Sequence, residues 1–580
     1  MSSLRSDVKV VNFDFMQPSL LPELGGVVTE RDSRFVLDYP EAELVFGLVF
    51  AVGTDYKPVL SYLEDYIRLG GYVTNKLQIS EWFPDSAARL KLNLQFPEEP
   101  EYERIASRID AGNKIRFETK RFDIFALMAA SKIFSGRDVN EHEEPVALKR
   151  RAHILVSLKR PEEVESLRKI YGPGFFLIGI FADEAERVDF LTNRKGLSPQ
   201  QALDLIDIDQ KETAVEYGQR TRDTFQMADL FVGLTGREYE RGLQRFLKLV
   251  FGDPFTTPSK DEHAMFLAYA ASLRSGDLSR QVGAALTCAD GDVISLGCND
   301  VPAPGGGLYS ADHGEADARD LKRKKDSNDA HKEQIIDDII LAFGKQFLPD
   351  KNKEELLKEA RPLLEKTLVS DVTEFGRSVH AEMDAIIAAG RTGVSFRDAT
   401  LYTTTFPCHT CTRHIIDAGV KRVLYIEPYP KSLAKELHND AIRLSGATRK
   451  GDSRIPFEPF LGIGPRRFFD LFSLKLSSGY TIERKENSSV VGWDLRRNAK
   501  PRVPMPPTSY LEREQLISKT LVSVFATKEE AQNDAKTTQS QERPRILETN
   551  GENSPPGRKL AGMENRRTGD NIVAREEGKG

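Results

Sequence analysis

Hydrophobic residues in the first 250 positions gather into short runs, and polar or amphipathic segments separate these runs. The longest run covers residues 43–52 and leads through Gly53 and Thr54 into a helix-like segment at 58–69. Apolar runs of this length, bounded by turn residues and alternating with helices, are typical of buried strands in a parallel sheet. Further strands are predicted at 153–158, 175–181 and 229–232. We therefore expect residues 1–250 to form a parallel-sheet α/β domain.

The pattern changes between residues 255 and 500. The predicted elements there are a helix at 262–273, strands at 283–287, 293–297, 400–404 and 422–426, and one helix at each of two motifs near residues 380 and 408. A polar insertion at about 305–375 separates the first three elements from the rest and contains an amphipathic helical stretch at 334–347. This order predicts a mixed sheet with helices on both faces, an α/β/α domain.

The chain beyond residue 500 contains few apolar residues. A Pro-rich stretch at 500–507 precedes a segment that becomes rich in Asn, Glu, Arg and Gly from about residue 527. Such a composition cannot bury enough apolar surface to offset the entropy of ordering. We expect residues 501–580 to be a Pro-rich linker followed by a disordered tail.

Two short motifs carry the clearest chemistry. His380 and Glu382 form a His-x-Glu sequence, and Pro407, Cys408 and Cys411 form Pro-Cys-x-x-Cys. The combination resembles the signature of zinc-dependent nucleobase deaminases. One imidazole and two thiolates provide three ligands and leave the fourth tetrahedral position open for water, as in catalytic zinc sites. His380, Cys408 and Cys411 are therefore the predicted metal ligands, for Zn²⁺.

Both motifs are predicted at helix starts, because Ser378 suits an N-cap and Pro407 suits a first helical position. In mid-helix the side chains of His380 and Glu382 would point about 200° apart, whereas at a helix start both can face one pocket. Glu382 is then the predicted catalytic residue, which moves protons between the attacking water, the ring nitrogen and the departing ammonia. A structural zinc site, or two buried thiols, is the alternative.

Composition narrows the class of substrate. The 580 residues exceed what a single core accommodates, and four cysteines fit a cytoplasmic protein without a disulfide framework. We find no apolar run long enough to span a bilayer and no signal-like N-terminus, so a soluble, cytoplasmic protein is expected. The net charge is −6 with both signs interspersed. A polynucleotide substrate is thereby disfavoured, and a free nucleotide is preferred.

A weaker motif follows the first predicted strand. Gly47, Gly53, Thr54 and Asp55 occupy the place of a phosphate-binding loop, and they are the candidates for binding a nucleotide at the N-terminal domain. The spacing departs from the Walker A pattern, and Thr54 replaces its lysine. Phosphoryl transfer is thus not expected. A nucleotide-sensing role and a simple tight strand-to-helix turn both remain open.

Further segments sharpen the resemblance. Those containing Arg274 (Ser-Leu-Arg-Ser-Gly-Asp), Gly283 (Gln-Val-Gly-Ala-Ala) and Asn299 (Gly-Cys-Asn-Asp-Val-Pro) resemble deoxycytidylate deaminases. By this resemblance Arg274 would approach a substrate phosphate and Asn299 would hydrogen-bond the deoxyribose or base. The alternative is that Arg274 is a surface charge and Asn299 a turn residue.

The arrangement of residues 40–500 resembles the two-domain bacterial anti-phage dCTP deaminases. That family joins a kinase-like P-loop domain with a degenerate loop to a deoxycytidylate deaminase domain of the cytidine-deaminase-like fold. The resemblance implies hydrolysis of dCTP, and also of dCMP, in antiviral defence, with a regulatory nucleotide at the N-terminal domain and assembly into a homo-oligomer. A housekeeping dCMP deaminase and a non-catalytic nucleotide-sensing regulator are the alternatives.

Overall fold

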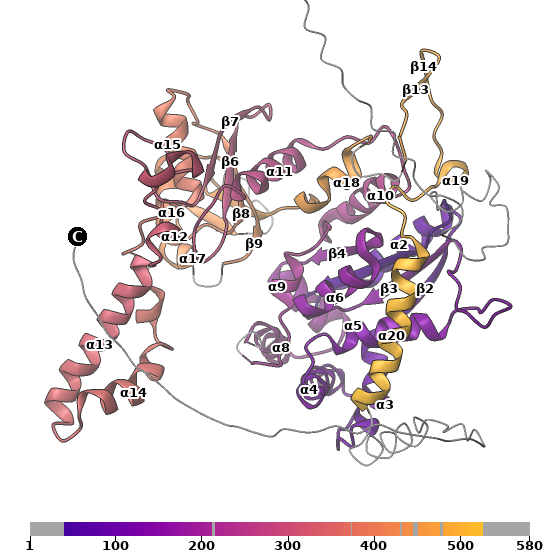
Figure 1. The fold of residues 1–580 in the computed structure, drawn as a ribbon, viewed down its shortest axis with the longest axis horizontal. Helices are drawn as coiled ribbons and strands as arrows, with labels where there is room; N and C mark the ends of the chain where they lie inside the picture. The colour runs from indigo at the N-terminus through magenta and orange to yellow at the C-terminus, as the bar shows by residue number, and fades with distance from the viewer. Residues whose placement is uncertain are drawn as a thin grey trace, which may run out of the picture. The chain divides into compact units, whose positions relative to one another are not determined.

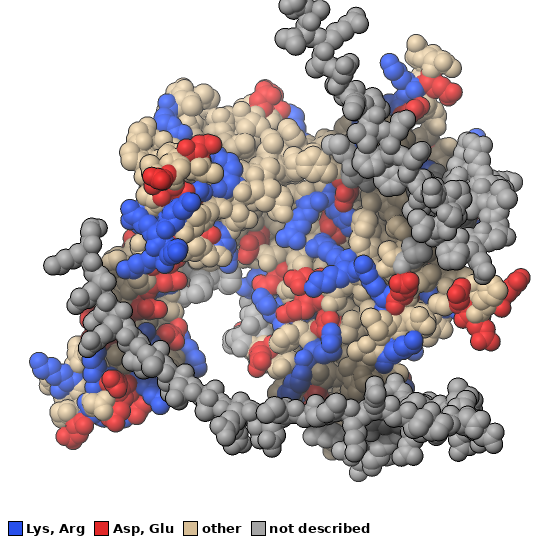
Figure 2. All heavy atoms as spheres, in the orientation of Figure 1, with Lys and Arg blue, Asp and Glu red and all other residues tan. Residues whose placement is uncertain are grey.

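The computed structural model describes residues 40–525, apart from 212–214, 373, 430–431, 445–450 and 476–479. The expected disordered tail from residue 527 therefore lies outside the described residues, as does the start of the N-terminal domain. Within the described ranges, no helix combines the length and the apolar character needed to cross a membrane. Lys, Arg, Asp and Glu side chains are mixed over the face shown in Figure 2.

The first sheet has the strand order β12-β5-β4-β1-β3-β2. Its strands are β1 (Leu44–Phe50), β2 (Val73–Gln78), β3 (Arg151–Val156), β4 (Phe175–Phe181), β5 (Leu230–Gly233) and β12 (Gly462–Ile463). Strands β1 to β5 pair in parallel, and β12 is antiparallel to β5. The predicted parallel α/β fold is confirmed, and the central strand β1 is the predicted apolar run.

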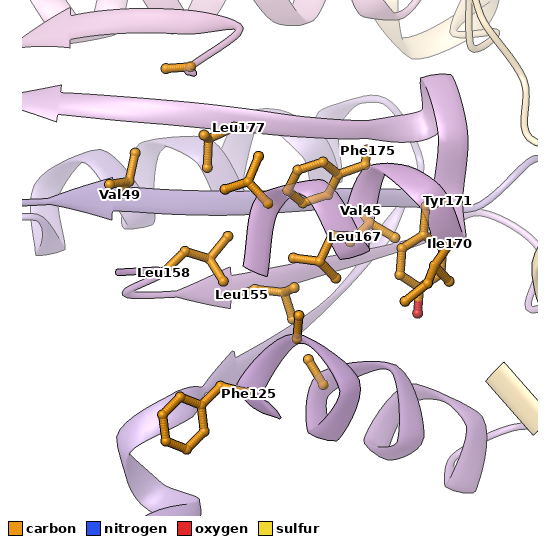
Figure 3. Packing of buried hydrophobic residues seen from close by; sticks show 14 of the residues in the cluster. Val45, Val49, Phe125, Leu155, Leu158, Leu167, Ile170, Tyr171, Phe175 and Leu177 are labelled. Atoms are coloured by element: carbon orange, nitrogen blue, oxygen red, sulfur yellow. The ribbon is translucent and has the colours of Figure 1, made fainter. Parts of the chain in front are cut away.

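Alternate residues of β1 belong to two different cores, as the period of two in a strand requires. Val45 and Val49 pack with residues of α5 (Ile124–Ser135) and α6 (Pro161–Tyr171), as Figure 3 shows in part. Phe46 and Leu48 pack with residues of α2 (Lys57–Leu69) and α10 (Glu238–Val250). Because both faces of the sheet are covered, its central strands are uniformly apolar.

The chain after residue 459 returns to this first sheet. Strand β12 pairs with β5, and helix α20 (Pro507–Phe525) packs against α5. This helix lies in the range that we expected to be a linker, and the expectation is corrected there. The cause is tertiary: Tyr510 and Glu514 are fully buried, although the segment as a whole is polar in sequence.

A buried charge network fixes α20. The Arg137 guanidinium donates to Glu43 at 2.6 Å and to Glu514 at 2.6 Å, and all three side chains are at most 1% exposed. Tyr171 donates to Glu514 and Tyr510 donates to Glu43. Burial by itself would raise the pKa of Glu43, but the hydrogen bonds with His153 and Arg137 lower it to about 2. Five segments of the chain thus meet in one set of buried polar contacts.

The second sheet has the strand order β10-β11-β9-β8-β6-β7. Its strands are β6 (Gly283–Thr287), β7 (Val293–Cys298), β8 (Thr400–Thr405), β9 (Arg422–Glu427), β10 (Ile442–Leu444) and β11 (Ile455–Pro459). β6 is antiparallel to β7 and β8, and the other neighbours are parallel. Helix α11 (Lys260–Ser272) packs on one face, and α15 (Ala381–Arg391) with α16 (His409–Asp417) packs on the other. The predicted α/β/α domain is confirmed.

The insertion forms a pair of helices, α13 (Ser327–Phe347) and α14 (Lys353–Leu364), drawn side by side in Figure 1. Ile336 and Ile340 of α13 pack against Leu356 of α14. Helix α13 begins earlier than predicted because Asp326 caps it by accepting from the Asp329 N–H. The other described elements are α3 (Phe83–Arg89), α4 (Glu101–Thr119), α7 (Glu184–Asp189), α8 (Pro199–Lys211), α9 (Thr221–Phe225), α12 (Asp320–Arg323), α17 (Ala434–Leu437), α18 (Phe468–Phe472), α19 (Leu495–Asn498), β13 (Lys485–Glu486) and β14 (Ser489–Val490).

Candidate active site

His380 is the N-cap residue of α15, and Glu382 lies in the first turn of that helix. The predicted helix start is confirmed, but the predicted cap Ser378 lies two residues earlier and donates instead to Asp277 at 2.9 Å. Glu382 is 4% exposed. Gly297 of β7 lets α15 approach this closely, since a Cβ there would lie 2.2 Å from the Ala381 carbonyl oxygen. The sheet therefore positions this motif directly.

Cys408 is the N-cap residue of α16, and its sulfur accepts from the Cys411 N–H at 3.4 Å. Pro407 thus precedes the cap rather than occupying the predicted first helical position. The sulfur performs the capping that an Asp or Ser side chain usually performs. Cys411 is buried on the same first turn. Gly419 ends the helix with φ +71°, as expected for a residue in the left-handed region.

The two helix starts bring the predicted ligands together. His380 Nδ1 lies 3.4 Å from the sulfur of Cys408 and 3.4 Å from that of Cys411, and one ligand atom from each residue falls within 4.8 Å of the others. Among the His, Cys, Asp and Glu side chains of the described residues, these three form the group whose spacing could hold a metal ion. One nitrogen and two sulfurs fit the ligand preferences of zinc. The donor set therefore fits the expected metal.

The protein groups themselves polarise this cluster. The hydrogen bond with Cys411 lowers the pKa of Cys408, and the hydrogen bond with His380 and its charge lower it further. Burial acts in the opposite direction, and the resulting pKa is about 3. The hydrogen bond with Cys408 raises the pKa of His380 to about 9, against desolvation. The bond to Cys408 and burial both raise the pKa of Cys411. One thiolate is thus already favoured, which is the form that binds a metal.

Glu382 lies beside this cluster and hydrogen-bonds with Cys411. Burial raises the pKa of Glu382 to about 7, although the charge of His380 lowers it. A carboxyl group with a pKa near neutrality can both accept and donate a proton at physiological pH. The site thus combines three metal-ligand atoms with one titratable acid.

A cavity of about 480 Å³ opens onto these residues. His380, Glu382 and Cys408 line it together with Asn299 and Tyr429. This volume lies within the range of small-ligand sites. Residues of the insertion line another part of the same cavity.

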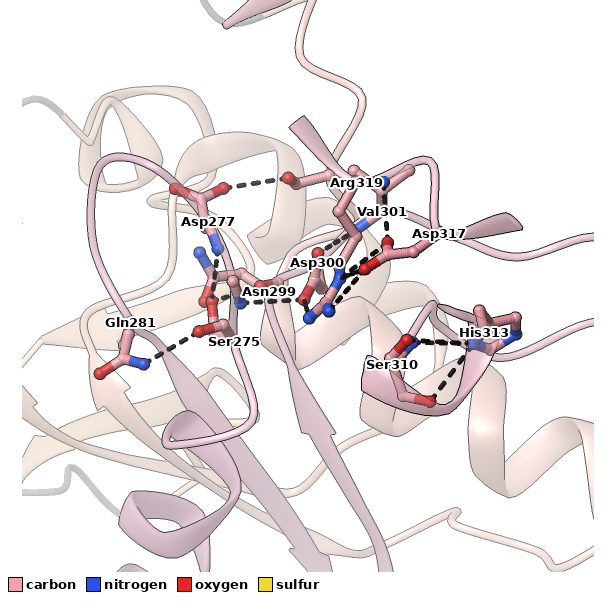
Figure 4. A network of polar contacts seen from close by, with 12 residues as sticks. Ser275, Asp277, Gln281, Asn299, Asp300, Val301, Ser310, His313, Asp317 and Arg319 are labelled. Atoms are coloured by element: carbon pink, nitrogen blue, oxygen red, sulfur yellow. Dashed lines mark hydrogen bonds and ion pairs between the residues drawn. The ribbon is translucent and has the colours of Figure 1, made fainter. Parts of the chain in front are cut away.

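Asn299 is buried, and its amide is largely committed to the protein. Its Oδ1 accepts from the Val282 N–H at 2.7 Å, and its Nδ2 donates to the Arg280 carbonyl at 2.9 Å. Ser275 also donates to the Asn299 carbonyl, within the neighbouring polar network that Figure 4 shows. Asn299 thereby holds the loop that leads into β6, while it lines the cavity.

Arg274 is exposed and does not line the cavity. Arg280, six residues later, does line it, carries an ion pair with Glu427 at 3.1 Å and lies over the Tyr429 ring. Arg280 is not among the site residues predicted from the sequence. Its position just before the predicted strand at 283–287 was the available signal, because loop ends at sheet edges commonly carry binding residues.

The four candidate residues of the N-terminal loop do not lie in one loop: Gly47 is in a strand, and Gly53, Thr54 and Asp55 are in the turn after it. Gly47 lies inside β1, where a Cβ would meet Leu158 at 2.5 Å, so it serves packing and not the loop. Gly53 has φ +86° and makes the turn, followed by the buried Thr54 and the partly buried Asp55. The Val52 N–H in this loop donates to the Asp209 carboxylate at 3.1 Å. A protein carboxylate thus already binds a backbone donor of the turn.

Fold and site together define the class, a hydrolytic deaminase built around a zinc-binding region. Residues 258–427 match the family described as "Cytidine and deoxycytidylate deaminase zinc-binding region". The deoxycytidylate deaminase of Enterobacteria phage T4 is 31% identical over 183 residues, which cover 31% of this chain and 83% of the phage protein. The chain belongs to the deoxycytidylate deaminase family.

Two solved structures are each similar to about a third of the chain. The dCMP deaminase of cyanophage S-TIM5, in complex with dCMP and dUMP, covers 35% of this chain and 98% of its own at 17% identity, with a TM-score of 0.21. A gluconokinase from Sinorhizobium meliloti 1021 covers 36% of this chain and 94% of its own at 11% identity, also with a TM-score of 0.21.

Proposed function

We propose that the protein hydrolyses deoxycytidine nucleotides to deoxyuridine nucleotides and ammonia. The observation that carries this proposal is the placement of buried Glu382 beside the His380, Cys408 and Cys411 donor atoms, with Glu382, His380 and Cys408 lining one cavity. A purely structural metal site has no use for a buried carboxyl group that is not a ligand. Similarity to the phage T4 deoxycytidylate deaminase supports the choice of base and sugar.

In this proposal His380, Cys408 and Cys411 hold zinc, which when bound supplies a water activated near neutral pH. Glu382 takes a proton from the attacking water and delivers it to ring N3 while the water oxygen adds to C4. Glu382 then takes the remaining proton from the new C4 hydroxyl and passes it to the amino group. The C4–N4 bond breaks, C4 becomes the carbonyl of the uracil ring, and ammonia leaves. The pKa of about 7 suits both directions of transfer.

The substrate phosphate is assigned to Arg280 rather than Arg274, because Arg280 lines the cavity. Asn299 holds the Arg280 carbonyl and so positions this loop. We further propose dCTP as a substrate, with depletion of dCTP in anti-phage defence as its purpose; the resemblance to two-domain dCTP deaminases supports both. The N-terminal domain is proposed as regulatory, and a nucleotide there would compete with Asp209 for the Val52 N–H.

The test follows ammonia release from each cytosine nucleotide and nucleoside, with and without added dTTP or ATP. We expect release from deoxycytidine nucleotides, reduced by about 10²- to 10⁴-fold in Glu382→Ala. Full activity in that variant contradicts the proposed mechanism. A housekeeping dCMP deaminase is the second candidate. A protein that deaminates dCMP but not dCTP identifies it.

A further inference from the structure

The insertion forms part of the wall of the active-site cavity. Asn328, Lys332 and Arg377 line it together with His380 and Glu382. These three residues come from the segment that runs from the start of α13 to the approach to the His380 motif. A segment outside the two zinc motifs therefore supplies side chains to the same site.

This wall is tied firmly to the rest of the site. Asn328 donates from Nδ2 to the Val372 carbonyl at 3.0 Å and accepts the Phe375 N–H at 3.3 Å. Arg377 donates to the Asp320 carboxylate and to the Ala318 carbonyl. The start of α13 is thereby held beside the residues that lead directly into His380. Lys332 lies five residues after Ser327, the first residue of α13. Its backbone is therefore held in place together with the start of the helix.

The three cations of the cavity differ in how firmly protein carboxylates hold them. Arg377 pairs with Asp320, whose side chain is 12% exposed. Arg280 pairs with Glu427, which is 31% exposed. Lys332 pairs with Asp329, which is 61% exposed, at 2.6 Å. Exposed pairs of this kind contribute little free energy. Since the Arg280 side chain is itself 48% exposed, its pair is also weak, and the Lys332 ammonium can exchange its partner for a more highly charged anion at a comparably small cost.

Three of the carboxylates that line the cavity have partners other than Lys332. Asp326 accepts the Asp329 N–H as the cap of α13, and Asp277 accepts the Ser378 hydroxyl. Asp320 accepts from Arg377, which balances its charge. Asp329 gives up its own partner when Lys332 binds an anion.

We propose that Lys332 binds the phosphate chain of the substrate beyond its first phosphate, so that the insertion selects for nucleoside triphosphates. The inference rests on the proposed function, in which Arg280 binds the first phosphate. Arg280 belongs to the loop held by Asn299, whereas Lys332 belongs to the insertion. A monophosphate needs the first cation alone, and a longer phosphate chain brings additional charge that the second cation can neutralise.

The experiment measures ammonia release from dCMP and dCTP by the full chain and by Lys332→Ala. We expect kcat/KM for dCTP to fall at least about tenfold, as loss of a hydrogen bond to a charged group implies, and that for dCMP to change less than about threefold. Lys332→Arg should retain most of the dCTP activity. Lys345→Ala is the matched control, because Lys345 is exposed on the same helix and does not line the cavity.

Equal losses on both nucleotides, or no loss on either, overturn the inference. So does a full chain that deaminates dCMP but leaves dCTP untouched, and in that case the proposed deamination itself stands. Absence of ammonia from every cytosine nucleotide contradicts the proposed function instead. The two failures are thereby distinguished.

Discussion

Three side chains at two helix starts set the chemistry at the scale of single residues. His380 and Cys408 are both N-cap residues, so their backbones have left the helical conformation and their side chains can turn across the helix ends. Cys411 then needs just one turn of helix to reach the same point. The local backbone, rather than a loop held by distant contacts, therefore places the three proposed metal ligands.

Cys411→Ser should lose bound zinc and ammonia release together, because a hydroxyl is a poor substitute for the thiolate that zinc prefers. The measurement is metal content per chain after gel filtration, paired with the activity assay. Cys288→Ser is the control, since Cys288 is a free cysteine away from the cluster, and it should keep both. Zinc retained at full stoichiometry in Cys411→Ser would show that this thiol is not a ligand.

Asn299→Ala tests whether this residue positions the Arg280 loop. The substitution leaves the Val282 N–H and the Arg280 carbonyl without their partners, which should lower the free energy of unfolding by about 1–3 kcal/mol. Because Arg280 is displaced as well, we expect KM for the nucleotide to rise more than kcat falls. Urea denaturation and steady-state kinetics give the two readings. Unchanged stability with a collapse of kcat would indicate direct contact with the reacting base.

The clustering of the three proposed zinc ligands was predictable from the sequence, because their spacing within each helix start determines where they point. The choice between Arg274 and Arg280 was not, since both follow the same helix and the path of the loop decides which one reaches the cavity. Gly47 was proposed for the loop although it lies inside the predicted strand at 43–52. The structure keeps it in β1, where the close approach of Leu158 leaves no room for a side chain.

At the scale of elements, α20 shows how a polar sequence can become a buried helix. Its inward face carries Tyr510 and Glu514, which pair with groups from three earlier segments. Ile517, Leu521 and Val524 follow them on this face at helical spacing, but the charged residue at position 514 interrupts the apolar pattern from which helices are predicted. Strand β12 is equally hard to predict, because two residues carry no pattern. The long apolar strands of both sheets, by contrast, were visible in the sequence.

Arg137→Met should destabilise the chain by about 3–5 kcal/mol, because it leaves Glu43 and Glu514 buried without their shared cation. Urea denaturation followed by far-UV circular dichroism measures the change. Leu516→Ala, on an exposed position of α20, is the control and should stay within about 0.5 kcal/mol. A cost in Arg137→Met no larger than in the control would mean that the network does not hold the helix.

At the scale of the whole molecule, the N-terminal domain is not confined to the N-terminal half of the sequence. Its sheet takes β12 from residues 462–463, and its α5 face takes α20 from residues 507–525. Arg245 of α10 also donates to the buried Glu262 of α11, which accepts the Ile463 N–H. The segments on both sides of the deaminase domain are thus required to finish one structure.

Truncation after Pro506 should expose Tyr171 and leave Arg137 with a single carboxylate, so the melting temperature should fall by several degrees. Truncation after Ala526 keeps all of α20 and serves as the matched control. Differential scanning calorimetry of both fragments and of the full chain makes the comparison. Identical melting of the two fragments would contradict a stabilising role for the helix.

The return of the chain to its first sheet also orders events during protein synthesis. Strands β1 to β5 are complete at residue 233, but α20 ends at residue 525. At ribosomal rates of roughly 5–20 residues per second, the interval between them lasts about 15 to 60 s. Until β12 is made at residues 462–463, β5 is an open edge and the nascent chain is exposed to wrong pairing, and Glu514 does not exist until later still. The domain that the ribosome makes first is therefore completed last.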